Sequence, residues 1–157
     1  MHEQTNQYTK QYNNWCDILQ LDKTKTIQDL EIGSLHGGSV CAFHTNFGPN
    51  VISETIDPFS VCDNSEDYNE NENNENYEIF KYNTKSLNNT HYKIPSFRIL
   101  PTLQNNYYDV IYIDGNHNLC NTLKDAVYSV RKLKSKGYLI LDDYDWNVGI
   151  KKTPKAQ

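Results

Sequence analysis

The apolar and polar positions along the chain alternate between the two periods that distinguish strands from helices. Four short segments predict strands: Ile27–Ile32 and Val51–Ile56, which begin and end with apolar residues, and the apolar runs Val110–Ile113 and Tyr138–Leu141. Helices are predicted in the segments around them: Tyr8–Leu21, Ser39–Phe47, Tyr77–Leu87 and Leu119–Lys134. A weaker segment predicts one further strand at Ile94–Phe97, followed by a turn of helix at Ile99–Leu103.

The last of these helices has the clearest stripe of apolar residues at helical spacing: Leu119, Leu123, Ala126, Val127, Val130 and Leu133. Strands that alternate with helices predict an α/β fold, a Rossmann-like parallel sheet of about five strands with helices on both faces. Right-handed crossovers place the loops that follow the strands at one edge of such a sheet. The 157 residues are expected to form a single domain, 1–157.

One segment interrupts this pattern. Residues Asp63–Asn76 are rich in asparagine and contain six acidic and no basic residues. Such a composition cannot bury enough apolar surface to order itself, so a disordered insertion at 63–76 is expected.

The charge and the cysteines narrow the class of protein. The formal net charge is −5, and the chain outside 63–76 is nearly neutral, so nucleic acid is not an expected partner. No apolar run is long enough to span a bilayer, and the polar start does not resemble a signal peptide. The four scattered cysteines form no C-x-x-C pair, which indicates free thiols and a cytoplasmic location.

The segment Leu30–Ser39 is the first candidate for chemistry. A strand ending in Glu31 runs into Gly33, Gly37, Gly38 and the start of a helix. Glycines let a ligand approach the backbone, and a helix start offers N–H groups to a carboxylate or phosphate. The alternative is an ordinary tight turn between a strand and a helix.

Acidic residues follow the other predicted strands. Asp57 ends the second strand, where a carboxylate can accept both hydroxyls of a ribose, although an Asp before Pro58 is also a common turn former. Asp114, Asp142 and Asp143 end two later strands, and carboxylates across neighbouring strands suit a divalent cation such as Mg²⁺. The alternative is that one member of the Asp142–Asp143 pair caps a turn and no metal binds.

These motifs together resemble the class I S-adenosylmethionine-dependent methyltransferases, in particular a metal-dependent O-methyltransferase-like subgroup. The resemblance implies that Gly33, Ser34 and Gly37 make room for the methionine part of S-adenosylmethionine, near Glu31 and Ser39. It implies a ribose contact for Asp57 and adenine contacts for Ser96 and Phe97. It also implies that Asp114, Asp142 and Asp143 bind magnesium. His117 stands where relatives carry a basic residue, and it serves as a catalytic base beside Asp114 or merely hydrogen-bonds within its loop.

The resemblance ends near Trp146, whereas members of the family continue with a helix and two strands that complete a seven-stranded sheet. A C-terminally truncated version of that fold is therefore expected, with a possible homodimer through the exposed strand Tyr138–Leu141. The predicted function is O-methylation of a small hydroxylated molecule or sugar with metal assistance. The alternative is an inactive module that binds the cofactor or a partner. The glycine spacing argues against a dinucleotide enzyme.

Overall fold

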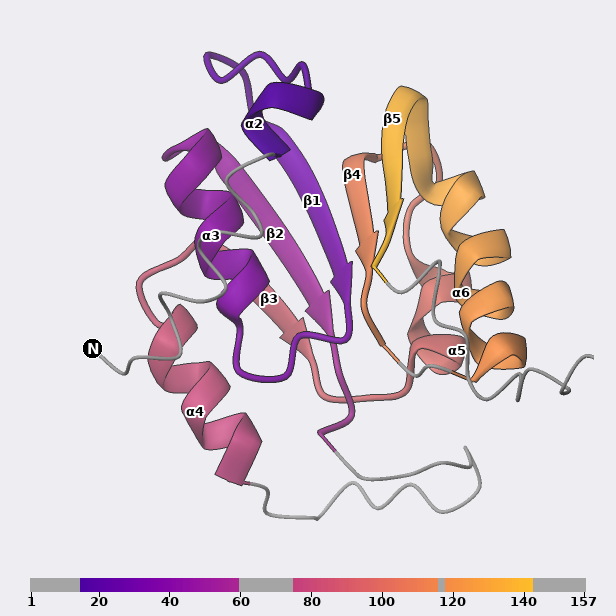
Figure 1. Ribbon diagram of the computed structural model, residues 1–157. Coiled ribbons are helices and arrows are strands. Elements are labelled where there is room, and N and C mark those ends of the chain that lie inside the picture. The colour runs from indigo at the N-terminus through magenta and orange to yellow at the C-terminus, as the bar shows by residue number, and fades with distance from the viewer. Residues whose placement is uncertain (1–14, 60–74, 116–117, 143–157) are drawn as a thin grey trace, which may run out of the picture.

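The computed structural model describes residues 15–59, 75–115 and 118–142. They contain a five-stranded parallel sheet in the order β3-β2-β1-β4-β5. The strands are β1 (Ile27–Ile32), β2 (Val51–Ile56), β3 (Asn89–Tyr92), β4 (Tyr108–Ile113) and β5 (Leu133–Leu141). The helices are α2 (Trp15–Ile18), α3 (Gly38–Phe47), α4 (Glu75–Thr84), α5 (Ser96–Ile99) and α6 (Leu119–Lys132), with a 3-10 turn η1 (Leu100–Thr102). Figure 1 shows all five strands pointing to one common edge.

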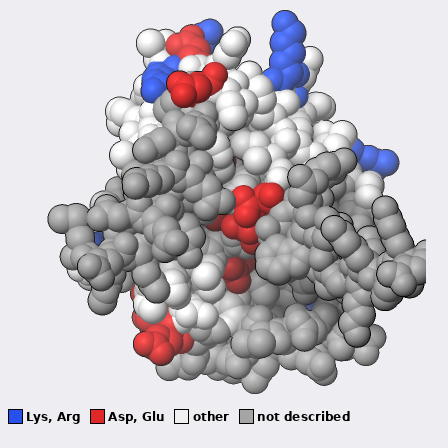
Figure 2. All heavy atoms as spheres, in the orientation of Figure 1, with Lys and Arg blue, Asp and Glu red and all other residues white. Residues whose placement is uncertain are grey.

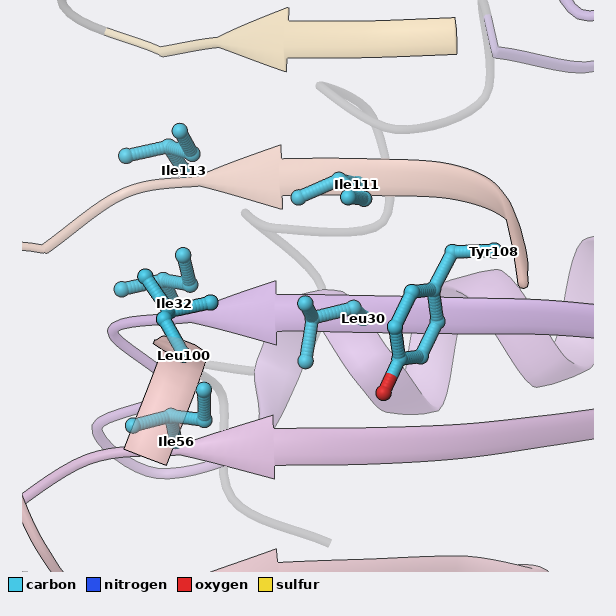
Figure 3. Packing of buried hydrophobic residues seen from close by; sticks show 7 residues of the cluster. All are labelled: Leu30, Ile32, Ile56, Leu100, Tyr108, Ile111 and Ile113. Carbon is cyan, nitrogen blue, oxygen red and sulfur yellow. The ribbon is translucent and has the colours of Figure 1, made fainter. Parts of the chain in front are cut away.

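One face of the sheet carries the larger apolar core. Alternate residues of the central strands pack there against α5, η1 and α6, and the fully buried Leu100 of η1 reaches the strands (Figure 3). The buried members are Leu30, Ile32, Ile56, Leu100, Tyr108, Ile111 and Ile113. Strands β1 and β4 are buried on both faces, and in β1 the second face carries the buried carboxyl groups of Asp29 and Glu31 rather than apolar side chains.

The other face is covered by α2, α3 and α4. Phe43 and Phe47 of α3 pack on Ile27, Val51 and Val110, one from each of the three central strands. Beside them, Val40, Phe59 and Phe80 form a smaller cluster that joins α3 to α4. The two-faced α/β sheet predicted from the sequence is confirmed.

Most predicted elements appear within a few residues of their expected positions. Strands Ile27–Ile32 and Val51–Ile56 are confirmed at both ends, and β4 starts two residues before Val110. The predicted strand Tyr138–Leu141 is the part of β5 that pairs regularly with β4, after an irregularity. Only the end of the predicted helix Tyr8–Leu21 is described, as α2.

Two boundaries near the predicted insertion need correction. Helix α4 begins at Glu75, so Glu75 and Asn76 belong to a helix rather than to the insertion assigned to 63–76, and α4 ends at Thr84 rather than Leu87. The remainder of the predicted disordered segment falls largely on 60–74, outside the described residues.

The strand predicted at Ile94–Phe97 is wrong. The strand is Asn89–Tyr92, and Ser96 starts α5, with Pro95 in the capping position. At the edge of the described sheet, β3 pairs with β2 alone and its side chains stay partly or fully exposed, so it needs no apolar run. A pattern based on burial therefore selected the apolar residues beyond the actual strand.

Helix α6 is confirmed except for its last two predicted residues, and most of its apolar stripe faces outward, whereas Ala126 and Leu133 pack against the main core. Leu119, Leu123, Val127 and Val130 are 81, 61, 57 and 59% exposed. The inward side is polar instead: Asp125 accepts a hydrogen bond from Ser96, with 2.6 Å between Oδ1 and Oγ. The buried Lys132 Nζ donates to the Leu103 carbonyl at 2.6 Å and to Asn105 Oδ1 at 2.9 Å. None of the helices in the described ranges is long and apolar enough to cross a membrane.

Candidate functional site

The loop after β1 is held in place by Asp57, at the end of β2. Oδ2 of Asp57 accepts hydrogen bonds from the backbone N–H groups of Ser34 and Leu35, at 2.9 and 2.8 Å. Oδ1 accepts from the N–H of Phe59 at 2.7 Å. The carboxylate predicted to bind a ribose thus already fixes the glycine-containing loop. A carboxylate offers about four acceptor positions, so three backbone donors leave it room for one further donor.

Two predicted cofactor glycines are required by the protein's own packing. Gly33 has φ +88°, and a Cβ placed on it would lie 2.1 Å from the carbonyl oxygen of Asp114. Gly37 has φ +76°, and its Cβ would lie 2.8 Å from Cγ2 of Thr84 in α4. Glycine at 33 lets the loops after β1 and β4 touch, and glycine at 37 lets α3 begin against α4. Their predicted contacts with methionine stay predictions.

Glu31 and Ser39 are bonded to each other. The Ser39 hydroxyl donates to Oε1 of Glu31, and both side chains are buried beneath the loop. Burial raises the pKa of Glu31 well above its usual value, and the hydrogen bond from Ser39 partly offsets this. The negative charges of Asp29, Asp114 and Asp57 raise this pKa further. The site is therefore an acidic environment that favours a cationic ligand.

Within this loop, the side chain of Ser34 gives the strongest indication that a ligand binds. Its side chain is 3% exposed, and within the described part of the chain its hydroxyl oxygen is buried without a hydrogen-bond partner. A buried hydroxyl that lacks a partner costs free energy, which a bound polar group would recover. This observation fits the predicted role of Ser34 in binding the cofactor.

Asp114 and Asp142 are brought together at the ends of β4 and β5, and a tyrosine links them. The hydroxyl of Tyr112 lies 3.1 Å from Oδ2 of Asp114 and 2.8 Å from Oδ1 of Asp142. Tyr112 is buried, and the ring of Trp15 packs edge-on against it at 5.0 Å between centroids. Sequence analysis missed Tyr112, although the period of two along β4 places it on the same side as Asp114.

Figure 2 shows acidic atoms in a hollow over the ends of the central strands. No three His, Cys, Asp or Glu side chains among residues 15–59, 75–115 and 118–142 are arranged to hold a metal. Two described carboxylates, those of Asp114 and Asp142, lie near the Tyr112 hydroxyl. This number is compatible with Mg²⁺, because that ion often binds one or two carboxylates and keeps several waters. The other predicted site residues, Asp143 and His117, lie outside the described residues.

Ser96 and Phe97 lie in α5, on the opposite face of the sheet from α3. The Ser96 hydroxyl is engaged with Asp125 of α6, whose pKa burial raises to about 6 against the opposing effect of that hydrogen bond. Phe97 is 40% exposed. Their predicted adenine contacts stay predictions, and Ser96 already has a structural role in joining α5 to α6.

A second buried polar chain runs from β1 to α3. Ser53 Oγ donates to Oδ2 of Asp29 at 2.9 Å, and Nε2 of His44 lies 3.0 Å from the same Oγ. Burial raises the pKa of Asp29 to about 7, although the Ser53 hydrogen bond lowers it in part. No motif in the sequence indicated these hydrogen bonds.

These features define a parallel α/β sheet with a glycine loop after β1 and acidic residues after β2, β4 and β5. Residues 30–144 match a family model described as a methyltransferase domain. The chain belongs to this methyltransferase-domain family, and its fold is that of the class I S-adenosylmethionine-dependent methyltransferases. The predicted family is confirmed at this level.

A protein of Acanthamoeba polyphaga mimivirus is 30% identical over 116 residues, which are 73% of this chain and 50% of that protein. The chain thus spans about half the length of its curated relative. A cofactor-bound protein from MTB superposes with a TM-score of 0.60 at 16% identity, covering 90% of this chain and 56% of the other. The O-methyltransferase TomG from Streptomyces achromogenes, in complex with SAM, gives 0.58 at 13% identity, covering 90 and 66%. At these identities the two structures support the fold alone.

Proposed function

We propose that this chain binds S-adenosylmethionine and transfers its methyl group to a hydroxyl of a small molecule or sugar. The observation that carries the proposal is the buried hydroxyl of Ser34, which has no hydrogen-bond partner among the described residues and lies in a loop fixed by two hydrogen bonds to Asp57. A loop fixed before the ligand arrives loses little conformational entropy on binding. One structural neighbour of the same fold, the O-methyltransferase TomG, is known in complex with SAM, and we carry that ligand over to this chain as part of the proposal.

The residues suit the charges of this ligand. When bound, S-adenosylmethionine supplies an electrophilic methyl group on a positively charged sulfur. Glu31, Asp57 and Asp114 influence one another electrostatically at the strand ends, and together they favour a cation there. Ser34 and Ser39 are the proposed contacts of its amino-acid part, with Gly33 and Gly37 shaping the loop, and Asp57 keeps one acceptor position for a ribose hydroxyl.

We place the acceptor hydroxyl beside Tyr112. A tyrosine hydroxyl has one proton, so Tyr112 can donate fully to only one of Asp114 and Asp142 at a time. Asp114 is the proposed catalytic carboxylate that orients the acceptor, and His117 is the proposed base, since its ordinary pKa is near neutrality. Asp114 and Asp142, with Asp143, would hold a magnesium ion, which would lower the pKa of the acceptor hydroxyl.

Calorimetric titration with S-adenosylhomocysteine tests the cofactor site. Ser34→Ala should weaken binding by about 1–3 kcal/mol, the usual contribution of a hydrogen bond to a charged group. Asp57→Ala should weaken it further, because it frees the loop as well. Lys25→Ala is the matched control, since its side chain is 78% exposed in a turn before β1. Wild-type protein that is folded but binds no S-adenosylhomocysteine would refute the proposal.

The same samples test the metal and the chemistry. Magnesium should raise the melting temperature of the wild type but not of Asp142→Ala, which should still bind S-adenosylhomocysteine. Equal responses would exclude these carboxylates as a magnesium site. Binding of the cofactor without methyl transfer to any hydroxylated acceptor in a broad panel would instead favour the inactive binding module. The acceptor class and the cytoplasmic location stay predictions.

A further inference from the structure

Strands β1, β2 and β3 present two rows of polar side chains to the face of the sheet that α3 and α4 cover (Figure 1). The pairing of the strands aligns Asp29, Ser53 and Asn89 in one row and Glu31, Thr55 and His91 in the next. The four members on β1 and β2 are at most 3% exposed. This layer is apolar in most sheets covered on both faces, but here it holds two buried carboxyl groups.

Glu31 is surrounded by negative charge. Its side chain is 2% exposed, and the hydrogen bond that it accepts comes from the neutral hydroxyl of Ser39. In the described part of the chain, the charges that act on it are those of Asp29, Asp57 and Asp114, all of them negative. A buried carboxylate without a balancing cation is costly, and such a group keeps its proton instead.

The other ionisable side chains around Glu31 do not supply the balancing cation. Its Cα partner on β4 is Tyr112, and Cys41 lies on α3, but neither a phenol nor a thiol can carry a positive charge. Burial, reinforced by the charge of Lys93, lowers the pKa of His91 to about 4, so that ring is neutral at pH 7. Two further histidines make hydrogen bonds to other residues: His36 to Asn76 and His44 to Ser53.

The loop directly after β1 is where a cation can approach. Ser34 follows Glu31 by three residues, and its buried hydroxyl has no hydrogen-bond partner among the described residues. The ligand proposed above has an ammonium group on its amino-acid part. An opposite charge within about 4–6 Å favours the ionised form of a carboxyl group. An ammonium group at this loop can therefore ionise Glu31 without contacting it.

We infer that Glu31 carries a proton while the site is empty and releases it when the ammonium group of the ligand binds. The proton passes to the buffer, so the site exchanges one positive charge for another. The exchange rests on the proposed binding of S-adenosylmethionine and links it to pH. Because binding releases a proton, the affinity should rise with pH, by up to about tenfold per pH unit, until Glu31 is ionised in the free protein as well.

Titration calorimetry of the full chain with S-adenosylhomocysteine, which lacks the charged sulfur, counts the protons. Phosphate and Tris buffers differ in the heat that they take up with each proton, so the difference between the two measured enthalpies gives the number released. The wild type should release about one proton at pH 7. The deaminated analogue, which keeps the carboxylate but lacks the ammonium group, should release none. This comparison of ligands needs no variant.

A variant assigns the proton to its residue. Glu31→Gln should release no proton, and at pH 8 it should bind S-adenosylhomocysteine at least about tenfold more weakly than the wild type. At pH 6, where the wild type holds the proton too, the difference should shrink. A merely structural role of Glu31 would weaken binding equally at both values. Asp29→Asn is the matched control: it removes the other buried carboxyl from the same face of β1, and it should keep the proton release.

The outcomes separate the exchange from the proposed function. Binding with equal enthalpies in the two buffers overturns the exchange and leaves the proposed function intact. Proton release that persists in Glu31→Gln but disappears in Asp29→Asn assigns the proton to Asp29 and overturns it too. A deaminated analogue that releases as many protons would show that the ammonium group is not the trigger. A folded wild type that binds no S-adenosylhomocysteine refutes the proposed function and the exchange together.

Discussion

Helices α4 and α6 flank opposite ends of the sheet and turn their apolar residues in opposite directions. Phe80 of α4 is 1% exposed and packs with Phe59 and Tyr77 around His91 of β3, the ring centroid of Phe80 lying 4.7 Å from that of His91. Helix α6 instead buries Asp125 and Lys132 and exposes its leucines and valines. One end of the sheet is thus completed by the chain itself, while the other presents its apolar groups outward.

Core truncation should distinguish these ends most strongly. Phe80→Ala should lower the free energy of unfolding by about 3–5 kcal/mol at any protein concentration, because it leaves a cavity. Leu123→Ala should change it by less than about 0.5 kcal/mol, because that side chain is 61% exposed. Urea denaturation measures both. Equal costs would mean that the stripe of α6 is buried in the folded protein.

A second substitution probes the centre of the sheet, between the two ends. There the loops after β1 and β4 touch. Gly33→Ala should destabilise the protein by about 2–4 kcal/mol, since the new Cβ meets the Asp114 carbonyl and φ is positive. Gly48→Ala is the matched control: φ +89° and ψ −165° strain any side chain there too, but no atom lies within 4 Å of its Cβ, so it should cost less than Gly33→Ala, about 1–2 kcal/mol. If the two variants unfold at the same urea concentration, the loops do not touch as closely as described.

A dependence of stability on pH is expected from the buried Asp29 beneath α3. Its pKa is raised to about 7 in the folded protein, against 3.8 ordinarily, so folding favours the protonated form. Its contribution to stability is therefore complete below about pH 4 and is lost as the pH rises through 7. Asp29→Asn should flatten the fall in stability between pH 5 and pH 8, leaving a residual slope from Glu31. Thermal melts at both values check this, and parallel slopes in the two proteins would disprove it.

The sequence predicted Ile27–Ile32 and Val51–Ile56 well because each segment begins and ends with apolar residues and is followed by turn-forming residues, Gly33 and Asp57 with Pro58. It failed at β3, since an edge strand does not need apolar residues at its ends. Helical spacing showed which residues of α6 share a side but not where that side faces. The direction depends on the hydrogen bonds of Asp125 to the Ser96 hydroxyl and of Lys132 to the Leu103 carbonyl. Likewise, Asp114 and Asp142 could be predicted to converge, whereas the Tyr112 hydroxyl between them depends on the pairing of β4 with β5.

The buried amine of Lys132 has a practical consequence. Among the lysines in the described ranges it alone is buried, and its ammonium group is enclosed by the carbonyls and the amide of the segment after η1. Reagents that acylate lysines should therefore modify the exposed amines rapidly. The amine of Lys132 should react only when α6 separates from η1. The rate of labelling at Lys132, measured by mass spectrometry, therefore reports how often this end of the molecule opens.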